Sequence, residues 1–147
     1  MFTSSIVLNE WRHYVFQYDG TKQIIYENGL KIDENTITLS LNTQQKFTIG
    51  AKFNNTGAFN GRLYDFRYYN RVLPQNQITD IYNNNTSYGD EVIQLYNTDV
   101  ARTEGFSHAN IAKFDGINYL SIPYTPTLNT PQFTVSIWVN AAKLAFG

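Results

Sequence analysis

Cysteine is absent from this chain, and so are long apolar runs. The lack of cysteine excludes disulfide frameworks, thiolate metal sites and cysteine nucleophiles. No run of apolar residues is long enough to span a membrane, and the segment after Met1 lacks the basic and apolar regions of a signal peptide, so we expect no membrane insertion. The 11 basic and 12 acidic residues are scattered singly and give a net charge of −1. Such a chain has no concentration of positive charge that would bind a phosphate backbone, so nucleic acid is not an expected partner.

The composition is instead rich in aromatic and amide side chains, with 11 Tyr, 10 Phe and 17 Asn. Tyr and Phe favour half-buried strands, and Asn favours turns, so the mixture predicts many short strands joined by tight loops. A length of 147 residues fits one domain with a core of its own. The same side chains would suit stacking on sugars, but the structural explanation already accounts for them.

Period-two alternation of apolar residues marks most of the expected strands. One hairpin is expected within residues 23–32, where Asn28 and Gly29 form the pair typical of a type I′ turn. A stretch of strand, Asp-Gly turn and strand is expected over residues 111–123. The other expected strands cover residues 11–18, 36–41, 46–51, 92–97 and 132–140.

The segment "GRLYDFRYYN" breaks the alternation of its own strand. Leu63 would face inward, but the next inward positions by alternation would be the charged Asp65 and Arg67, whereas Phe66 and Tyr68 are apolar. One extra residue near Tyr64 and Asp65 would restore the register, so the sequence predicts a β-bulge there.

One short helix is expected over residues 74–83. Pro74 stands at a typical first helical position, and Ile78, Ile81 and Tyr82 follow at helical spacing. About ten strands with a single helix predict an all-β fold, an antiparallel β-sandwich.

Specific residues also resemble a known family. The segments "WRHYVFQYDGTKQIIYENG", "KFTIGA" and "FNGRLYDFRYYNRVLPQNQI" resemble the C-terminal half of laminin-G-like, concanavalin A-like jelly-roll domains, a group related to the pentraxins. The positions that follow the family pattern are Trp11, His13, Asp19, Gly20, Asn28, Gly29, Gly50, Gly61, Asp65, Arg67, Tyr69, Asn70, Arg71 and Leu73. The resemblance implies a jelly-roll sandwich.

The order of the two halves is reversed with respect to that family. Residues 1–83 resemble its C-terminal half, residues 84–91 are linker-like, and residues 92–147 resemble its N-terminal half through "KFDGINYLSIP" and "FTVSIWV". Three explanations remain open: a single permuted domain, a slice through a tandem array, and a segment completed by strands of another chain. If the halves fold together, the resemblance implies that Asp65 and Asp115 approach each other.

Catalytic patterns are not evident in the sequence. His13 lies in a dense strand and His108 in a polar loop, where structural or surface roles are more common than catalysis. The glutamates are isolated from one another and form no dyad: Glu10, Glu27, Glu34, Glu91 and Glu104. We therefore expect a protein that is not an enzyme.

Calcium is the cofactor that the resemblance implies, in a structural role. The matching positions are Asp65, at the expected bulge, and Asp115 with the carbonyl of Gly116. The alternative is that Asp115 only shapes its Asp-Gly turn and that Asp65 pairs with Arg67 or Arg71.

Loop-borne aromatic and amide side chains are the candidates for ligand binding. Rings stack on sugar faces and amides hydrogen-bond hydroxyls. The candidates are Asn54, Asn55, Phe59, Asn60 and Tyr124. Ordinary loop chemistry in an Asn-rich chain is the alternative.

The function implied by the resemblance is a non-catalytic recognition or adhesion module for carbohydrate or protein ligands, at an extracellular, cell or virion surface. The rival hypothesis is a structural assembly subunit of a virion, fibre or surface layer, which self-associates through exposed strand edges. A degenerate glycoside hydrolase is a third and less favoured alternative.

Overall fold

The structure is a computed structural model that describes residues 7–40, 46–51, 57–84, 86–95, 106–107 and 111–143. These residues form two antiparallel sheets, one α-helix and one 3-10 helix. The elements are β1 (Arg12–Tyr18), β2 (Lys22–Glu27), β3 (Leu30–Thr36), β4 (Phe47–Ile49), β5 (Asn60–Tyr69), α1 (Gln75–Asn84), β6 (Ile93–Leu95), β7 (Phe106–Ser107), β8 (Ile111–Asp115), β9 (Leu120–Ile122), η1 (Pro126–Leu128) and β10 (Phe133–Lys143).

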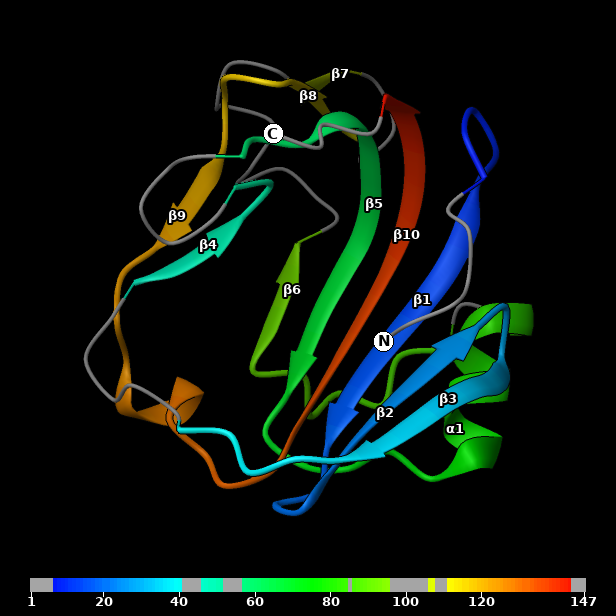
Figure 1. Cartoon of the computed structure of the whole chain (residues 1–147), viewed down its shortest axis with the longest axis vertical. Helices are drawn as coiled ribbons and strands as arrows, with labels where there is room; N and C mark the ends of the chain where they lie inside the picture. Colours follow the sequence, from blue (N-terminus) through cyan, green and yellow to red (C-terminus); the bar gives the residue numbers. More distant parts are fainter. Residues whose placement is uncertain are drawn as a thin grey trace.

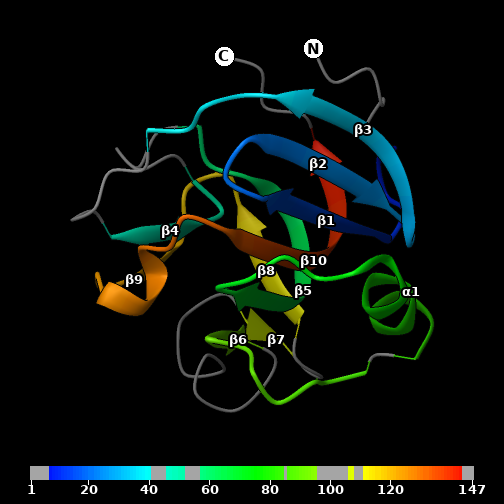
Figure 2. The ribbon, with the colours of Figure 1, turned by 90° about the horizontal axis from the view of Figure 1, so that it is seen from below.

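The main sheet has the order β3-β2-β1-β10-β5-β8-β7, and β6 also pairs with β5, so it contains eight strands. The second sheet consists of β4 and β9 within the described residues. Figure 2 shows β4 and α1 on opposite sides of the main sheet. The fold is therefore the expected antiparallel β-sandwich of jelly-roll type, with a helix against the outer face of its larger sheet.

Strands from the two halves of the sequence alternate in the main sheet. β10, near the end of the chain, lies between β1 and β5, which both come from the first half (Figure 1). β8, also from the second half, pairs with the other edge of β5. The first half alone would leave β1 and β5 without their shared neighbour.

The β2–β3 hairpin confirms the expected type I′ turn, because Asn28 and Gly29 both have positive φ, 50° and 80°. The strand expected over residues 36–41 is wrong in its described part. Thr36 is the last residue of β3 and pairs with Lys22, the first residue of β2, so the partner strand ends there. Residues 37–40 follow without strand structure, and residue 41 lies outside the described residues.

The predicted bulge in β5 is present. Arg67 pairs with Ser136 and Tyr64 pairs with Trp138, so two residues of β5 stand opposite the single residue between them on β10. Asp65 takes a φ of 50°, which the short polar side chain of Asp tolerates better than most. The bulge returns Phe66 to the inner face.

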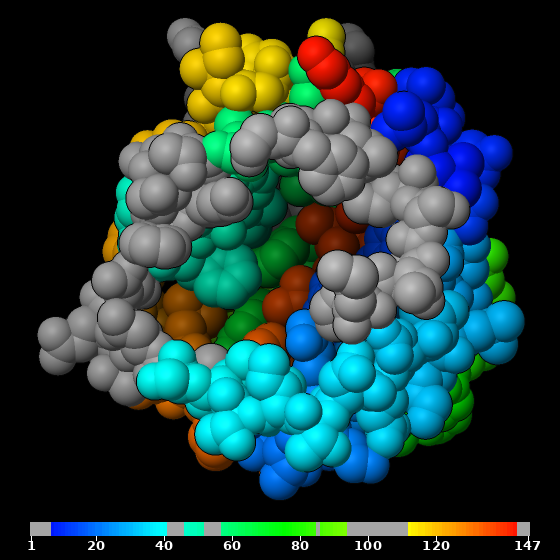
Figure 3. Space-filling model, viewed as in Figure 1, coloured from blue at the N-terminus to red at the C-terminus, as the bar shows by residue number. Residues whose placement is uncertain are grey.

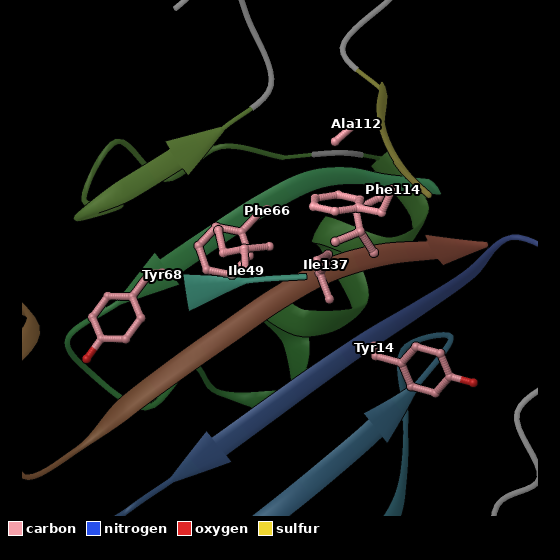
Figure 4. Packing of buried hydrophobic residues seen from close by; sticks show 8 residues of the cluster. Tyr14, Ile49, Phe66, Tyr68, Ala112, Phe114 and Ile137 are labelled. Atoms are coloured by element: carbon pink, nitrogen blue, oxygen red, sulfur yellow. The ribbon is translucent and has the colours of Figure 1, made fainter. Parts of the chain in front are cut away.

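Helix α1 also confirms the expectation, and it begins one residue after Pro74, whose carbonyl accepts hydrogen bonds from the backbone N–H groups of Gln77 and Ile78. Ile78 and Ile81 are fully buried against the main sheet. A second apolar cluster fills the other side of the main sheet (Figure 4). Residues of β4 and β9 cover part of it.

The segment "KFDGINYLSIP" divides between the two sheets. β8 joins the main sheet beside β5, whereas β9 pairs with β4. The turn after Asp115 thus carries the chain from one layer of the sandwich to the other. The expected strand over residues 46–51 is β4, which is shorter than predicted.

Candidate functional site

Asp65 and Arg67 form a fully buried ion pair on the helix side of the main sheet, each with 1% of its side chain exposed. Arg67 Nε donates to both carboxylate oxygens of Asp65 at 2.9 and 3.0 Å, and Nη2 donates to Oδ2 at 2.6 Å. The bulge places this pair on the helix side, because without the extra residue Asp65 and Arg67 would share the inner face with Leu63. Burial alone lowers the pKa of Arg67, but the hydrogen bonds and charge of Asp65 outweigh it and raise that pKa.

Asp115 occupies a different environment at an exposed turn. Its Oδ1 accepts hydrogen bonds from the backbone N–H groups of Asn118 at 3.0 Å and of Ile117 at 2.9 Å. These bonds lower the pKa of Asp115. Gly116 completes the turn with a φ of 88°. The carboxylate therefore shapes the turn, as the alternative reading stated.

The structure does not bring Asp65 and Asp115 together. Asp115 pairs with Asn60, the first residue of β5, and Asp65 lies five residues further along that strand. At about 3.3 Å per residue the two positions are roughly 16 Å apart. Asp65, Asp115 and Gly116 therefore do not fit a single calcium site, and no cluster of three or more His, Asp or Glu side chains among the described residues is placed to hold a metal.

The expected ligand-binding residues are also dispersed. Asn54 and Asn55 lie outside the described residues. Phe59 packs edge-on against Phe114, with ring centroids 6.0 Å apart, and belongs to the core periphery. Asn60 donates to the carbonyl of Asp115 at 3.4 Å, and Tyr124, which follows β9, is 40% exposed. These side chains do not form one described site.

His13 and Ser136 form a buried Ser–His contact under the helix, with Nε2 and Oγ 2.8 Å apart. Both residues are fully buried. The imidazole packs against Trp138 and Tyr82, with ring centroids 5.2 and 5.9 Å away. Burial, together with the charge of Arg67, lowers the pKa of His13 to about 4. The imidazole is neutral at ordinary pH, and no substrate can reach its contact with Ser136.

A second buried polar group fixes the chain that leads into α1. Gln17 donates to the carbonyl of Leu73 at 2.8 Å and to Thr134 Oγ1 at 3.1 Å. Thr134 in turn donates to the carbonyl of Arg71 at 2.7 Å and accepts from the Leu73 backbone N–H at 3.2 Å. These bonds tie the loop before the helix to the two central strands, β1 and β10.

The linker-like segment is tied to the same face. Glu91 Oε1 accepts hydrogen bonds from the hydroxyls of Tyr69 and Ser87 and from the backbone N–H of Tyr88. Arg71 pairs with Asp90 at 2.5 Å. The described part of residues 84–91 therefore packs against the main sheet.

The opposite face of the main sheet carries a hollow. Figure 3 shows that its floor comes from β5, β10 and β1. Register places four apolar side chains side by side across four strands of this face, and we call them the apolar row: Ile25, Phe16, Val135 and Tyr68. Phe16 and Val135, in the middle of the row, are only half-buried. An apolar concave surface with partly exposed side chains is the kind of surface that binds partners.

Comparison with family models gives one match, to the concanavalin A-like lectin/glucanases superfamily, over residues 2–79. This match covers just over half of the chain. The chain belongs to this superfamily. A search of curated proteins and a search of solved structures each found no match.

Superfamily membership at this coarse level indicates a module that binds carbohydrate or protein. Several positions of the family pattern are buried on the helix side of the main sheet: His13, Asp65, Arg67, Tyr69 and Leu73. Arg71 is partly exposed and binds Asp90 and Gln77, a residue of α1. These positions therefore help to hold the helix on the sheet.

The sequence alone did not indicate that Gln17, Thr134 and Ser136 are buried polar residues on the helix side of the main sheet. Gln17 and Thr134 face each other in the β1–β10 register, although they are 117 residues apart. Alternation in β10 could have indicated a polar face, since Thr134, Ser136 and Asn140 share a side of that strand. No local spacing connects them to β1.

Proposed function

We propose that this chain is a non-catalytic recognition module that binds a carbohydrate or protein partner through the hollow of its main sheet. The observation that carries the proposal is the hollow itself, whose floor comes from β5, β10 and β1 (Figure 3). Register and packing place the half-buried Phe16 and Val135 on this face. Among the described strands, only β4 and β9 lie opposite the eight strands of the main sheet, and η1 packs beside them against Tyr68. The superfamily match supports recognition as the general role.

The non-catalytic part of the proposal follows from the placement of the polar side chains. The buried contact between His13 and Ser136 lies under α1, on the face opposite the hollow. The carboxylate of Glu27 accepts hydrogen bonds from Arg12 and Tyr14, and Glu34 is paired with Lys22 and Lys31. These groups have structural partners, so they favour binding over bond cleavage.

An extracellular setting is part of the proposal, because laminin-G-like domains typically function outside cells. Within the described residues no helix has the length and apolar character needed to cross a bilayer. Placement on a cell or virion surface would suit an adhesion role.

Binding assays on the whole chain test the proposal. The purified protein is applied to a glycan array and to immobilised extracellular matrix proteins, and β-glucan hydrolysis is measured in parallel. Saturable binding without hydrolysis is the expected result. Hydrolysis of any β-glucan would contradict the non-catalytic assignment. Absence of binding in every assay would contradict a recognition function.

Self-association is the second candidate function, and the observation that favours it is the edge strand β3. Leu30 and Ile32 on this strand are 71% and 40% exposed, and β3 pairs only with β2 in the described part of the chain. The neighbouring Lys31, Asp33 and Glu34 oppose edge pairing, as charged residues on edges do. Light scattering over a range of concentrations separates the two functions, since an assembly subunit must grow in mass with concentration.

A further inference from the structure

The two layers of the sandwich are unequal in width. Phe47 and Ile49 of β4 point toward the main sheet, and Phe47 packs against Phe66 and Tyr68 with ring centroids 5.6 and 5.8 Å away. The second sheet therefore covers the part of the main sheet around β5. In Figure 1, β10, β1 and β2 lie beyond β4, on the side away from β9.

The apolar row continues past this cover. From Tyr68 it crosses β10 at Val135 and β1 at Phe16, and it ends on β2 at Ile25. Neighbouring strands are about 4.8 Å apart, so the row extends roughly 14 Å from Tyr68. That width corresponds to two or three strands in a facing layer.

β4 offers a strand edge beside this row. β4 pairs with β9 on one side within the described residues, and Figure 1 places β4 between β9 and the central strands of the main sheet. The other edge of β4 therefore faces the hollow. Backbone N–H and C=O groups at a strand edge are ready to pair with another extended chain.

The polar atoms on the floor do not suit a sugar. The hydroxyl of Tyr14 donates to Glu27, that of Tyr18 to the carbonyl of Gly20, and that of Tyr68 to the carbonyl of Leu128. The three tyrosine hydroxyls that the described strands of the main sheet place on this face are thus already donated within the chain. Sugar hydroxyls placed on the apolar row would lose water and would find none of these three hydroxyl protons free to donate to them, which is unfavourable.

We propose that the hollow binds an extended peptide strand of a partner protein, which pairs with the edge of β4 that is unpaired among the described residues and places alternate apolar side chains on Phe16 and Val135. Backbone bonds to β4 supply affinity, and the apolar row selects side chains at every second position. This inference rests on the proposed function and specifies its ligand as protein.

A synthetic peptide of about ten residues, with alternating valine and threonine and a fluorescent label, tests the inference in anisotropy titrations with the whole chain. The control peptide has the same length with two central prolines, which cannot donate backbone hydrogen bonds. We expect saturable binding of the first peptide and binding weaker by roughly tenfold or more for the second. Equal binding of the two peptides would overturn the inference.

Val135→Thr locates the site, because it replaces a floor methyl by a hydroxyl, and it should weaken peptide binding about fivefold. Leu30→Thr is the matched control on the exposed edge strand β3 and should leave binding unchanged. Phe16→Tyr, which adds a hydroxyl to the floor and keeps the ring, replaces Val135→Thr if that variant unfolds. Full binding by the floor variant, or weakened binding by Leu30→Thr, would overturn the inference.

Hydrogen exchange gives an independent readout of the edge. Peptide should protect backbone amides within residues 46–51 and leave those of β3 unchanged. Protection of β3 instead would overturn the inference. If glycans bind but the peptide does not, the inference fails and the recognition function stands; if glycans, matrix proteins and the peptide all fail to bind, both fail.

Discussion

Asp65 and Arg67 depend on each other at the scale of single residues. Three hydrogen bonds join them in a site that is 1% exposed, and the bulge exists at the same position. Removing the carboxylate would be costly, because the ion pair between Arg67 and Glu91, at 3.7 Å, is too long to replace the three lost hydrogen bonds.

Asp65→Asn should therefore lower the free energy of unfolding by about 3 kcal/mol, since it replaces the carboxylate that makes three hydrogen bonds with the buried Arg67 by a neutral amide. Asn tolerates the positive φ of this position, so the change isolates the charge. Asp115→Asn is the control in an exposed turn and should cost about 0.5 kcal/mol or less. Urea denaturation measures both. Equal losses for the two variants would contradict the assigned role of Asp65.

The lowered pKa of His13 predicts how the stability of the protein depends on pH. Its pKa in the folded protein is about 4, below the ordinary value of 6.5, so the unfolded chain binds the proton more tightly. The stabilisation is complete above pH 6.5 and is lost as the pH falls toward about 4. The loss amounts to about 3 kcal/mol.

Urea midpoints measured at intervals from neutral to mildly acidic pH check this expectation. His13→Gln should be less stable at neutral pH and should show a flatter decline between about pH 6.5 and about pH 4.5. An equally steep decline in the variant would show that other groups cause the acid sensitivity.

At the scale of elements, the two sheets of the sandwich come into close contact at Gly50. It follows β4 with a φ of 85°, and a Cβ there would overlap the ring of Phe114 on β8. Phe114 belongs to the main core, so the second sheet sits close to the main sheet at this point.

Gly50→Ala should destabilise the protein by about 3 kcal/mol, because it combines a left-handed backbone with overpacking of the core. Gly89→Ala is a matched control: its φ is 73°, and nothing lies within 4 Å of the added Cβ. That variant should lose only about 1–2 kcal/mol from the backbone. Thermal and urea unfolding measure the difference, and similar losses would contradict close packing of β4 on Phe114.

Local signals in the sequence predicted the elements that depend on local chemistry. Asn28 and Gly29 indicated the turn, the charge at Asp65 indicated the bulge, and Pro74 with Ile78 and Ile81 indicated the helix. The strand expected beyond Thr36 failed because strand length depends on the partner, and β2 begins at the residue that pairs with Thr36.

The candidate site was less predictable because it depends on register between distant strands. Nothing in the sequence shows that Asp115 pairs with Asn60, which separates it from Asp65. Phe59 was expected in a binding loop, but its ring packs on Phe114, a contact over 55 residues of sequence. The apolar row could not be predicted from the sequence either, since its four residues come from four separate strands.

At the scale of the whole molecule, strands from the two halves of the sequence alternate in the main sheet. β10 pairs with β1 over seven residues and with β5 on its other edge, so the floor of the hollow contains strands from both halves. We propose that residues 1–147 form one permuted domain on this basis. If each half were instead completed by the other half of a different chain, β10 would pair with β1 of that other chain.

Cysteine pairing tests this central claim most directly, because the natural chain has no cysteine. Arg12 and Val139 face each other on β1 and β10, at a separation suited to a disulfide. Arg12→Cys with Lys113→Cys is the control, since β10 and β5 lie between their strands. After mild oxidation at low concentration, the Arg12→Cys/Val139→Cys protein should have a disulfide within a monomer by mass spectrometry, and the control pair should not. A disulfide found only between chains would contradict the account.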